Sequence, residues 1–137
     1  MSDFFNPLQV ALYDRLSTEL APLAVYDSPP HQPDGRPNAD FPYVTIGDDT
    51  LLPFDTDTSL GVSATITLHV WSRYPGKKEA KTIMGLIYTT LHRQAATLVA
   101  VGYSFVDCLY EFGEIIEEVD GKTRHGVCRY RIIMEKT

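Results

Sequence analysis

The chain has 137 residues, of which 44% are hydrophobic and 22% are charged, and both fractions are ordinary for a folded globular domain. They exclude a disordered tail protein and a fibrous one. The 12 basic and 18 acidic residues give a net charge of -6, without a local basic run, which argues against tight nucleic-acid binding. We therefore expect a single domain over residues 1–137.

An amphipathic helix is predicted over residues 4–21, and Pro22 is expected to end it. Its N-cap is either Asn6, followed by Pro7 at the first helical position, or Asp3. The apolar side chains recur at spacings of three or four residues: Phe5, Leu8, Leu12, Leu16 and Leu20.

A short strand is predicted at residues 24–27, followed by an exposed loop at residues 28–40. The loop holds four prolines, which can neither continue a helix nor supply a full ladder of backbone donors. A loop of this length in a compact domain usually has a function.

Two further strands are predicted in the middle of the chain. Residues 41–47 are rich in strand-forming side chains, and the polar residues 48–60 after them are expected to form a second loop. Residues 62–71 then alternate strictly, as in a half-buried antiparallel strand. Val62, Ala64, Ile66, Leu68 and Val70 face one way, and Ser63, Thr65, Thr67, His69 and Trp71 face the other.

A second helix is predicted over residues 77–95, after a turn at residues 73–76. Its apolar stripe comprises Ala80, Ile83, Met84, Ile87 and Leu91. Leu86 and Tyr88 lie off that stripe, so the helix is either contacted on two sides or presents an apolar edge to a partner subunit.

Two long strands, at residues 103–119 and 122–135, complete the chain. The dipeptide Asp120-Gly121 between them suits a type I′ hairpin turn, with Glu117 opposite Arg124. Gly113 and Gly126 are candidate sites for β-bulges. The predicted order is α-β-β-β-α-β-β, an α+β domain whose mixed, mostly antiparallel sheet packs against two helices.

Cys108 and Cys128 lie on these two neighbouring strands, where a disulfide is geometrically conceivable. The chain begins without the features of a signal peptide, so we expect a reducing cytoplasm and two buried free thiols.

No constellation for catalysis or for a cofactor is found. His31, His69, His92 and His125 lack metal-ligand spacing, and no phosphate-binding glycine loop or nucleophile elbow is present. Residues 55–58 resemble the start of a calcium loop without its glycine and distal glutamate. The glutamates of the last hairpin are expected on its exposed face. We expect that the chain is not an enzyme, and that it has no cofactor, no bound metal and no membrane-spanning segment.

Aromatic side chains gather near the loops, either as core or as interface residues. They are Tyr26, Phe41, Tyr43, Phe54, Trp71 and Tyr74.

Four motifs, in this order and spacing, carry a family resemblance over nearly the whole chain. They are residues 25–27 before two prolines, residues 41–47, residues 54–58 continuing to Gly61, and residues 68–73 before a glycine turn, Glu79-Ala80 and a helix ending at Leu91. This pattern resembles the tail completion or tail terminator proteins of long-tailed bacteriophages.

The resemblance implies a ring, commonly of six subunits, at the head-proximal end of the tail tube. Such a ring stops tube growth and offers the surface to which the head docks. The implied partners are further copies of the chain, the tail tube protein and a head connector or head-closure protein, with DNA passing through without specific binding. The implied location is the virion, after assembly in the host cytoplasm.

Two groups of residues are the candidate interface. A ring needs one patch on each subunit to meet a different patch on the next. We predict subunit contact at His69, Trp71 and Arg73, and contact with the neighbour or the tube at Asp55, Thr56, Asp57, Thr58 and Leu60.

The acidic balance predicts a neutral to acidic lumen that repels DNA phosphates. A lumen lined by Arg36, Arg124, Arg129 or Arg131 would contradict that prediction. Two alternatives stay open: another head-tail component, such as a head-closure or adaptor protein, and a monomeric module that binds a small ligand between sheet and helices.

Overall fold

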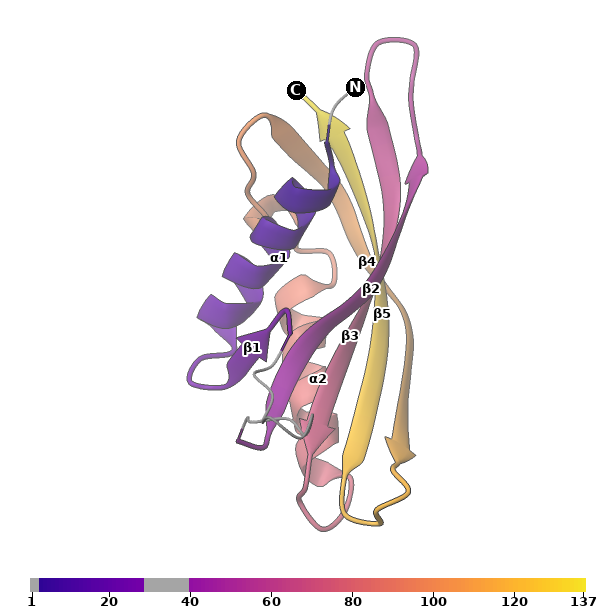
Figure 1. Ribbon diagram of the computed structural model, residues 1–137. Helices are drawn as coiled ribbons and strands as arrows, with labels where there is room; N and C mark the ends of the chain where they lie inside the picture. The colour runs from indigo at the N-terminus through magenta and orange to yellow at the C-terminus, as the bar shows by residue number, and fades with distance from the viewer. Residues whose placement is uncertain (1–2, 29–39) are drawn as a thin grey trace.

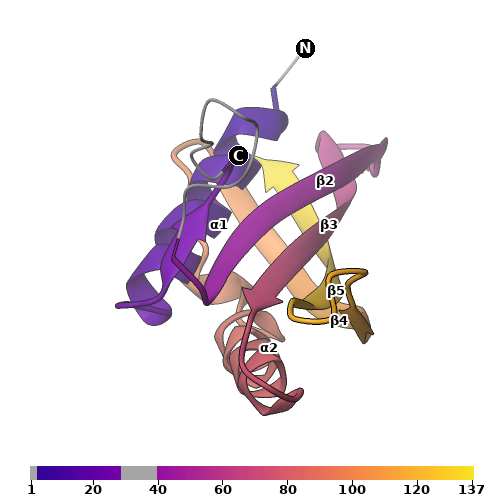
Figure 2. The ribbon, with the colours of Figure 1, turned by 60° about the horizontal axis from the view of Figure 1, so that its bottom comes forward.

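The computed structural model describes residues 3–28 and 40–137, which form one five-stranded sheet with two α-helices on one of its faces (Figure 1 and Figure 2). The predicted proline-rich loop, with His31 and Arg36, lies almost wholly outside these residues. The elements are α1 (Phe5–Glu19), β1 (Ala24–Tyr26), β2 (Tyr43–Pro53), β3 (Gly61–Ser72), α2 (Lys78–Leu91), the 3-10 helix η1 (Ala95–Thr97), β4 (Tyr103–Glu117) and β5 (Arg124–Lys136).

The strand order in the sheet is β1-β2-β3-β5-β4. β3 is therefore the central strand. β1 pairs in parallel with β2, and all other neighbouring strands are antiparallel. The α+β class, the element order and the mixed sheet with its C-terminal hairpin are confirmed.

The alternation of β3 organises the core. Its predicted apolar set is buried, and the intervening residues from Ser63 to Trp71 are half-exposed. Because successive side chains of a strand point to opposite faces, one face packs under the helices while the other faces away from them. The helices contribute Leu8, Leu12 and Leu16 from α1 and Ile83, Ile87 and Leu91 from α2.

The predicted loop at residues 48–60 is wrong in its first half, because β2 continues to Pro53. A register shift between Ile46 and Asp49 absorbs Gly47 and Asp48, after which Thr50 pairs with Thr65 and Leu52 with Ser63. Aspartates are tolerated there because their side chains reach water. Only residues 54–60 form the loop, and we call residues 51–62 the arm; it projects at the top of Figure 1.

The helix ends are shifted from the predicted ones. α1 begins before Asn6, at Phe5, and its N-cap residue is Phe4, neither of the two predicted caps. Asp3 still contributes at this end, since its Oδ1 accepts a hydrogen bond from the Phe5 N–H at 2.9 Å. α2 ends at Leu91 because Arg93 adopts φ 57° and donates its N–H to the Cys108 carbonyl at 2.7 Å.

The last hairpin has the predicted register but another turn. Glu117 pairs with Arg124, their charged groups 3.7 Å apart. The Gly121 N–H donates to the Glu118 carbonyl. A type I′ turn needs a positive φ at both central residues, but of Asp120 and Gly121 only Gly121 has one, so the turn is not type I′. The wider loop is possible because the Asp120 carboxylate accepts hydrogen bonds inside it.

The bulges of this hairpin lie at Val106 and Glu111, not at the glycines. Gly126 serves packing instead, since a Cβ there would lie 2.7 Å from the Met84 Sδ of α2.

Both cysteines are buried free thiols, as predicted. In the register of β4 and β5, Cys108 lies opposite Ile132 and Cys128 opposite Gly113, so the two are not paired across the hairpin. Burial raises the pKa of each thiol to about 12.

Candidate functional site

The sheet face turned away from α1 and α2, which we call the open face, is not covered by any element of the described chain (Figure 1). Three neighbouring strands meet there at one end. The register places Thr45 beside His69, and Tyr43 and His125 on either side of Trp71. Two of the predicted interface residues, His69 and Trp71, are therefore neighbours on this face.

Trp71 is the centre of the cluster. Its indole stacks on the His125 imidazole, with centroids 3.9 Å apart and planes 12° from parallel. Its Nε1–H donates to the Thr45 hydroxyl oxygen at 3.1 Å. One side chain thus ties together β2, β3 and β5.

A carboxylate and two imidazoles form a hydrogen-bonded chain beside Trp71. Glu118 Oε1 lies 2.8 Å from His125 Nδ1, and His125 Nε2 lies 2.7 Å from His69 Nδ1. Because a carboxylate only accepts, His125 Nδ1 is the donor to it, and in the neutral chain His69 Nδ1–H donates to His125 Nε2. Burial, followed by the neighbouring His125, lowers the pKa of His69, while Asp48 acts in the opposite direction.

Gly47 makes room for His69. A Cβ at Gly47 would lie 2.5 Å from the His69 Nε2, closer than side chains approach one another. The bulge in β2 and the position of the imidazole are therefore coupled.

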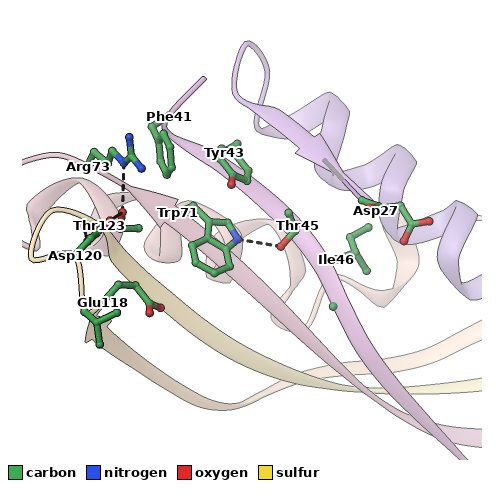
Figure 3. A pocket seen from close by; sticks show the side chains of 13 residues that line it. Asp27, Phe41, Tyr43, Thr45, Ile46, Trp71, Arg73, Glu118, Asp120 and Thr123 are labelled. Atoms are coloured by element: carbon green, nitrogen blue, oxygen red, sulfur yellow. Dashed lines mark hydrogen bonds between the residues drawn. The ribbon is translucent and has the colours of Figure 1, made fainter. Parts of the chain in front are cut away.

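A pocket of about 540 Å³ opens beside this cluster (Figure 3). Arg73, the third residue of the predicted group, directly follows the end of β3 and lies in the wall of this pocket. Its guanidinium carbon is 4.3 Å from the centre of the Phe41 ring, and its Nε–H donates to the Thr123 hydroxyl at 3.3 Å. Tyr43 joins the wall by contacts with Phe41 and Trp71. Several of the aromatic residues predicted near the loops thus form one surface.

The arm carries the other predicted group, Asp55, Thr56, Asp57, Thr58 and Leu60. Its tip is held by defined hydrogen bonds: the Thr56 N–H donates to the Ser59 carbonyl at 2.9 Å, and the Gly61 N–H to Asp55 Oδ1 at 3.0 Å. Leu52, Phe54 and Leu60 are 57%, 49% and 48% exposed.

The two predicted groups are not brought together. The arm adjoins Gly61 and the aromatic cluster lies around Trp71, at opposite ends of β3. At a strand rise of about 3.3 Å per residue, roughly 30 Å separate them. They are two surfaces and not one site.

Sequence reasoning missed a third surface, which we call the helix groove. It is a hollow of about 850 Å³ between the end of α1, β1 and the first half of α2. The off-stripe position of Leu86 was the available signal, since this side chain is 51% exposed and lies in the groove wall. The groove is lined by Leu20, Pro22, Leu23, Pro42, Tyr74, Ile83 and Leu86, among others, with Lys78 and Glu79.

Within residues 3–28 and 40–137, no group of three or more histidine, cysteine, aspartate or glutamate side chains converges to hold a metal. The same residues contain no helix with the length and apolar character that a membrane crossing needs. The arrangement offers surfaces for binding, and both nitrogens of His125 and the Nδ1 of His69 are engaged in the hydrogen-bonded chain with Glu118.

Comparison with known proteins gives one family and one shared fold. A family profile described as "Tail completion protein gp17" matches residues 10–135. The tail completion protein gp17 of Bacillus phage SPP1 is 33% identical over 91 residues, and the matched segment spans 66% of this chain and 66% of that relative.

A chain in a solved structure titled "Virion of native gene transfer agent (GTA) particle" superposes with a TM-score of 0.74 at 21% identity. It covers 93% of this chain and 94% of the other chain. At that identity the likeness shows a common fold.

Proposed function

Because the chain belongs to the tail completion protein gp17 family, we propose that it forms a ring, of six copies, that caps the head-proximal end of the tail tube. The ring ends tube growth and presents the surface to which the head is joined. Its partners are other copies of the chain, the tail tube protein and a head connector or head-closure protein.

Membership in this family makes the chain a structural component of the phage tail, located in the virion, and not an enzyme. The expected family, location and lack of enzymatic activity are thereby confirmed. The number of copies, the ring and the named partners belong to our proposal.

The arm is the observation that supports this function best. It projects from the sheet and has three exposed apolar side chains on a hydrogen-bonded frame. Exposed apolar groups held in a fixed geometry bind a partner without a large loss of conformational entropy. The aromatic cluster around Trp71 supplies a second surface on the same subunit, and a ring requires two different surfaces.

Passage of DNA favours a lumen that does not bind phosphate. Arginines that line the lumen would attract phosphate. Two of the four arginines named above for this reason are paired with carboxylates. Arg131 lies 2.9 Å from Glu111, and Arg124 lies 3.7 Å from Glu117. We propose that the lumen of the ring is neutral to acidic.

Negative-stain microscopy of the purified protein, alone and mixed with tail tubes, tests the proposal. Rings, or tubes capped at one end, are the expected result. A protein that stays monomeric and leaves tubes uncapped would contradict it. Particles assembled without the protein should have overlong or unjoined tails, whereas leaky heads would indicate a head-closure protein.

A further inference from the structure

The pocket beside Trp71 carries an excess of negative charge. Among the described residues that line it, the carboxylates of Asp27, Glu118 and Asp120 outnumber one cation, Arg73, by three to one, which leaves a net charge of -2. Figure 3 shows Asp27 on one side of the pocket and Glu118 with Asp120 on the other. A cationic group that enters the pocket therefore meets carboxylates on both sides.

Neutral donors hold two of these carboxylates in place. Asp120 accepts hydrogen bonds from the N–H groups of Lys122 and Thr123 and from the Thr123 hydroxyl, all at 2.8 Å. Glu118 accepts from His125, whose neutral imidazole supplies the donor. These bonds orient the carboxylates without adding a positive charge to the pocket.

The basic residues of the β4–β5 turn are not part of the wall. Lys122 and Arg124 follow Asp120 in the chain, but neither lines the pocket. The guanidinium nitrogens of Arg124 lie 2.9 Å from the Lys122 carbonyl oxygen and 3.7 Å from Glu117. The turn therefore supplies the pocket with carboxylates and not with cations.

The remaining wall is largely aromatic. Phe41, Tyr43 and Trp71 follow one another along it, with neighbouring ring centroids 5.1 and 6.4 Å apart. The Arg73 guanidinium already lies over the Phe41 ring, so this wall accommodates a cation. Aromatic faces attract cations, and arginine more often than lysine, because the guanidinium is planar and weakly hydrated.

The hydroxyl of Tyr43 is a polar group that awaits a partner. Tyr43 is only 2% exposed, and its hydroxyl forms no hydrogen bond with another residue of the described chain. Figure 3 shows this hydroxyl directed toward Trp71 and Thr45. Because a largely enclosed oxygen gains from a hydrogen bond, a ligand rich in N–H donors suits this position.

From these observations we infer that the pocket binds the guanidinium of an arginine side chain presented by a partner protein. The planar group stacks on the aromatic wall, and its N–H groups meet acceptors on Tyr43 and on the carboxylates at either side. Free arginine suits the pocket less well, because its own carboxylate is repelled by the three in the wall. The inference concerns a contact with a partner and does not depend on the proposed ring.

Fluorescence tests the inference directly, because Trp71 is the only tryptophan of the chain and lies in the pocket wall. The purified full-length protein is titrated with the blocked tripeptide acetyl-glycyl-arginyl-glycine amide, which should change the emission saturably. The same peptide with citrulline, which has nearly the same shape and no charge, should bind at least about tenfold more weakly. The lysine peptide should bind at least about threefold more weakly than the arginine peptide.

Variants of the wall test which groups hold the peptide. Asp27→Asn, at an exposed side chain, and Glu118→Gln, whose amide oxygen still accepts from His125, should each weaken binding about three- to tenfold. Tyr43→Phe keeps the ring and removes one acceptor, and should weaken binding about threefold. Asp14→Asn is the matched control, since it makes the same charge change at an exposed position on α1 and should leave binding unchanged.

Amide chemical shifts of Thr45 and Arg73 give a second readout that does not rely on fluorescence. If neither the emission nor these shifts respond to the arginine peptide, the inference is wrong. Equal binding of the arginine peptide and either the citrulline or the lysine peptide would also overturn it, as would undiminished binding in both Asp27→Asn and Glu118→Gln.

The source of the arginine is tested by a titration with free arginine. Tighter binding of the free amino acid than of the blocked tripeptide would make the pocket a site for a small molecule and would overturn the assignment to a partner protein. Ring formation and tube capping are scored separately by microscopy, so each of these failures leaves the proposed function standing.

Discussion

The indole of Trp71 lies flat against the imidazole of His125, with ring centroids 3.9 Å apart and planes inclined by 12°. The two residues are direct partners in the β3–β5 register, so the contact follows from the pairing of the strands. His125 also lies within hydrogen-bonding distance of Glu118 and His69. One pair thus connects the aromatic surface with the only carboxylate–histidine chain in the described part of the molecule.

Replacing Trp71 with alanine should weaken both the fold and the ring. The variant loses the stack with His125 and the hydrogen bond to Thr45, and we expect the free energy of unfolding to fall by about 2 kcal/mol. If this face makes subunit contact, sizing chromatography under native conditions should show rings shifting toward monomers.

Trp71→Phe is the matched control, because it keeps an aromatic ring while it removes the N–H donor to Thr45 and part of the ring area. It should retain most of the ring population. A Trp71→Ala protein that is folded by circular dichroism and forms rings as the wild type does would remove this residue from the interface.

His69 should make stability fall as the solution is acidified. Its folded-state pKa is lowered from the ordinary value of 6.5, so the unfolded chain takes up a proton that the folded chain refuses. The contribution of His69 is therefore complete above about pH 6.5 and is lost as the pH falls through that value toward the folded-state pKa.

Urea denaturation between about pH 7.5 and about pH 5 measures this effect. The wild type should lose stability more steeply on acidification than His69→Gln, whose amide can still donate toward His125. Parallel curves for the two proteins would show that His69 does not titrate differently on folding.

Replacing either of two glycines with alanine should change the stability of the protein, but in opposite directions. At Gly61, the base of the arm, a Cβ would lie 2.8 Å from the Phe54 carbonyl oxygen and 2.9 Å from the Met134 carbonyl oxygen. Backbone atoms cannot move aside cheaply, so Gly61→Ala should destabilise the protein by about 1–3 kcal/mol. At Gly85, in the middle of α2, nothing lies within 4 Å of the added atom, and Gly85→Ala should stabilise by about 0.5–1 kcal/mol.

Thermal unfolding of both variants checks this pair, with each serving as the control for the other. A Gly61→Ala protein as stable as the wild type would mean that the end of the arm is held less tightly than its contacts indicate.

Asp120 should control the order of the β4–β5 turn. Its Oδ1 accepts the Lys122 and Thr123 N–H groups, both at 2.8 Å, and its Oδ2 accepts the Thr123 hydroxyl at 2.8 Å. These bonds, the Thr123 backbone bond first, lower the pKa of Asp120 to about 2 from its usual 3.8. Their stabilising effect is therefore present above about pH 4 and is lost as the pH falls toward 2.

Hydrogen exchange followed by NMR measures that order. In Asp120→Ala the amides of Lys122 and Thr123 should exchange at least about tenfold faster than in the wild type, with Asp120→Asn between the two. Unchanged protection of both amides in the alanine variant would assign the order of the turn to its backbone alone.

Much of the fold could be predicted from local patterns. The strict alternation from Val62 to Val70 determined which side of β3 is buried, and the three-and-four spacing from Leu8 to Leu16 determined the buried face of α1. Opposite charges at Glu117 and Arg124 matched the register of the hairpin. Each of these is a property of neighbouring residues in the chain or across one turn, so composition and period are enough to reveal it.

The surfaces depended on contacts that no local pattern encodes. The segment from Asp48 to Pro53 begins with two aspartates and ends in a proline, so it does not look like a strand. It pairs because β3 offers it a partner ladder and the aspartate side chains stay in water. His69 and His125 lie 56 positions apart and meet only through the pairing of β3 with β5. The helix groove likewise exists only where the ends of two helices and β1 come together.

The sequence by itself therefore determined the α+β class, the order of the elements, the buried faces and the resemblance to a family of tail proteins. Only the tertiary structure decided that the arm and the Trp71 cluster are separate surfaces and that a groove forms between the end of α1, β1 and α2. The physical reason is range: periodicity is set over a few residues, whereas a binding surface is formed by side chains that strand register and helix packing bring together from distant parts of the chain.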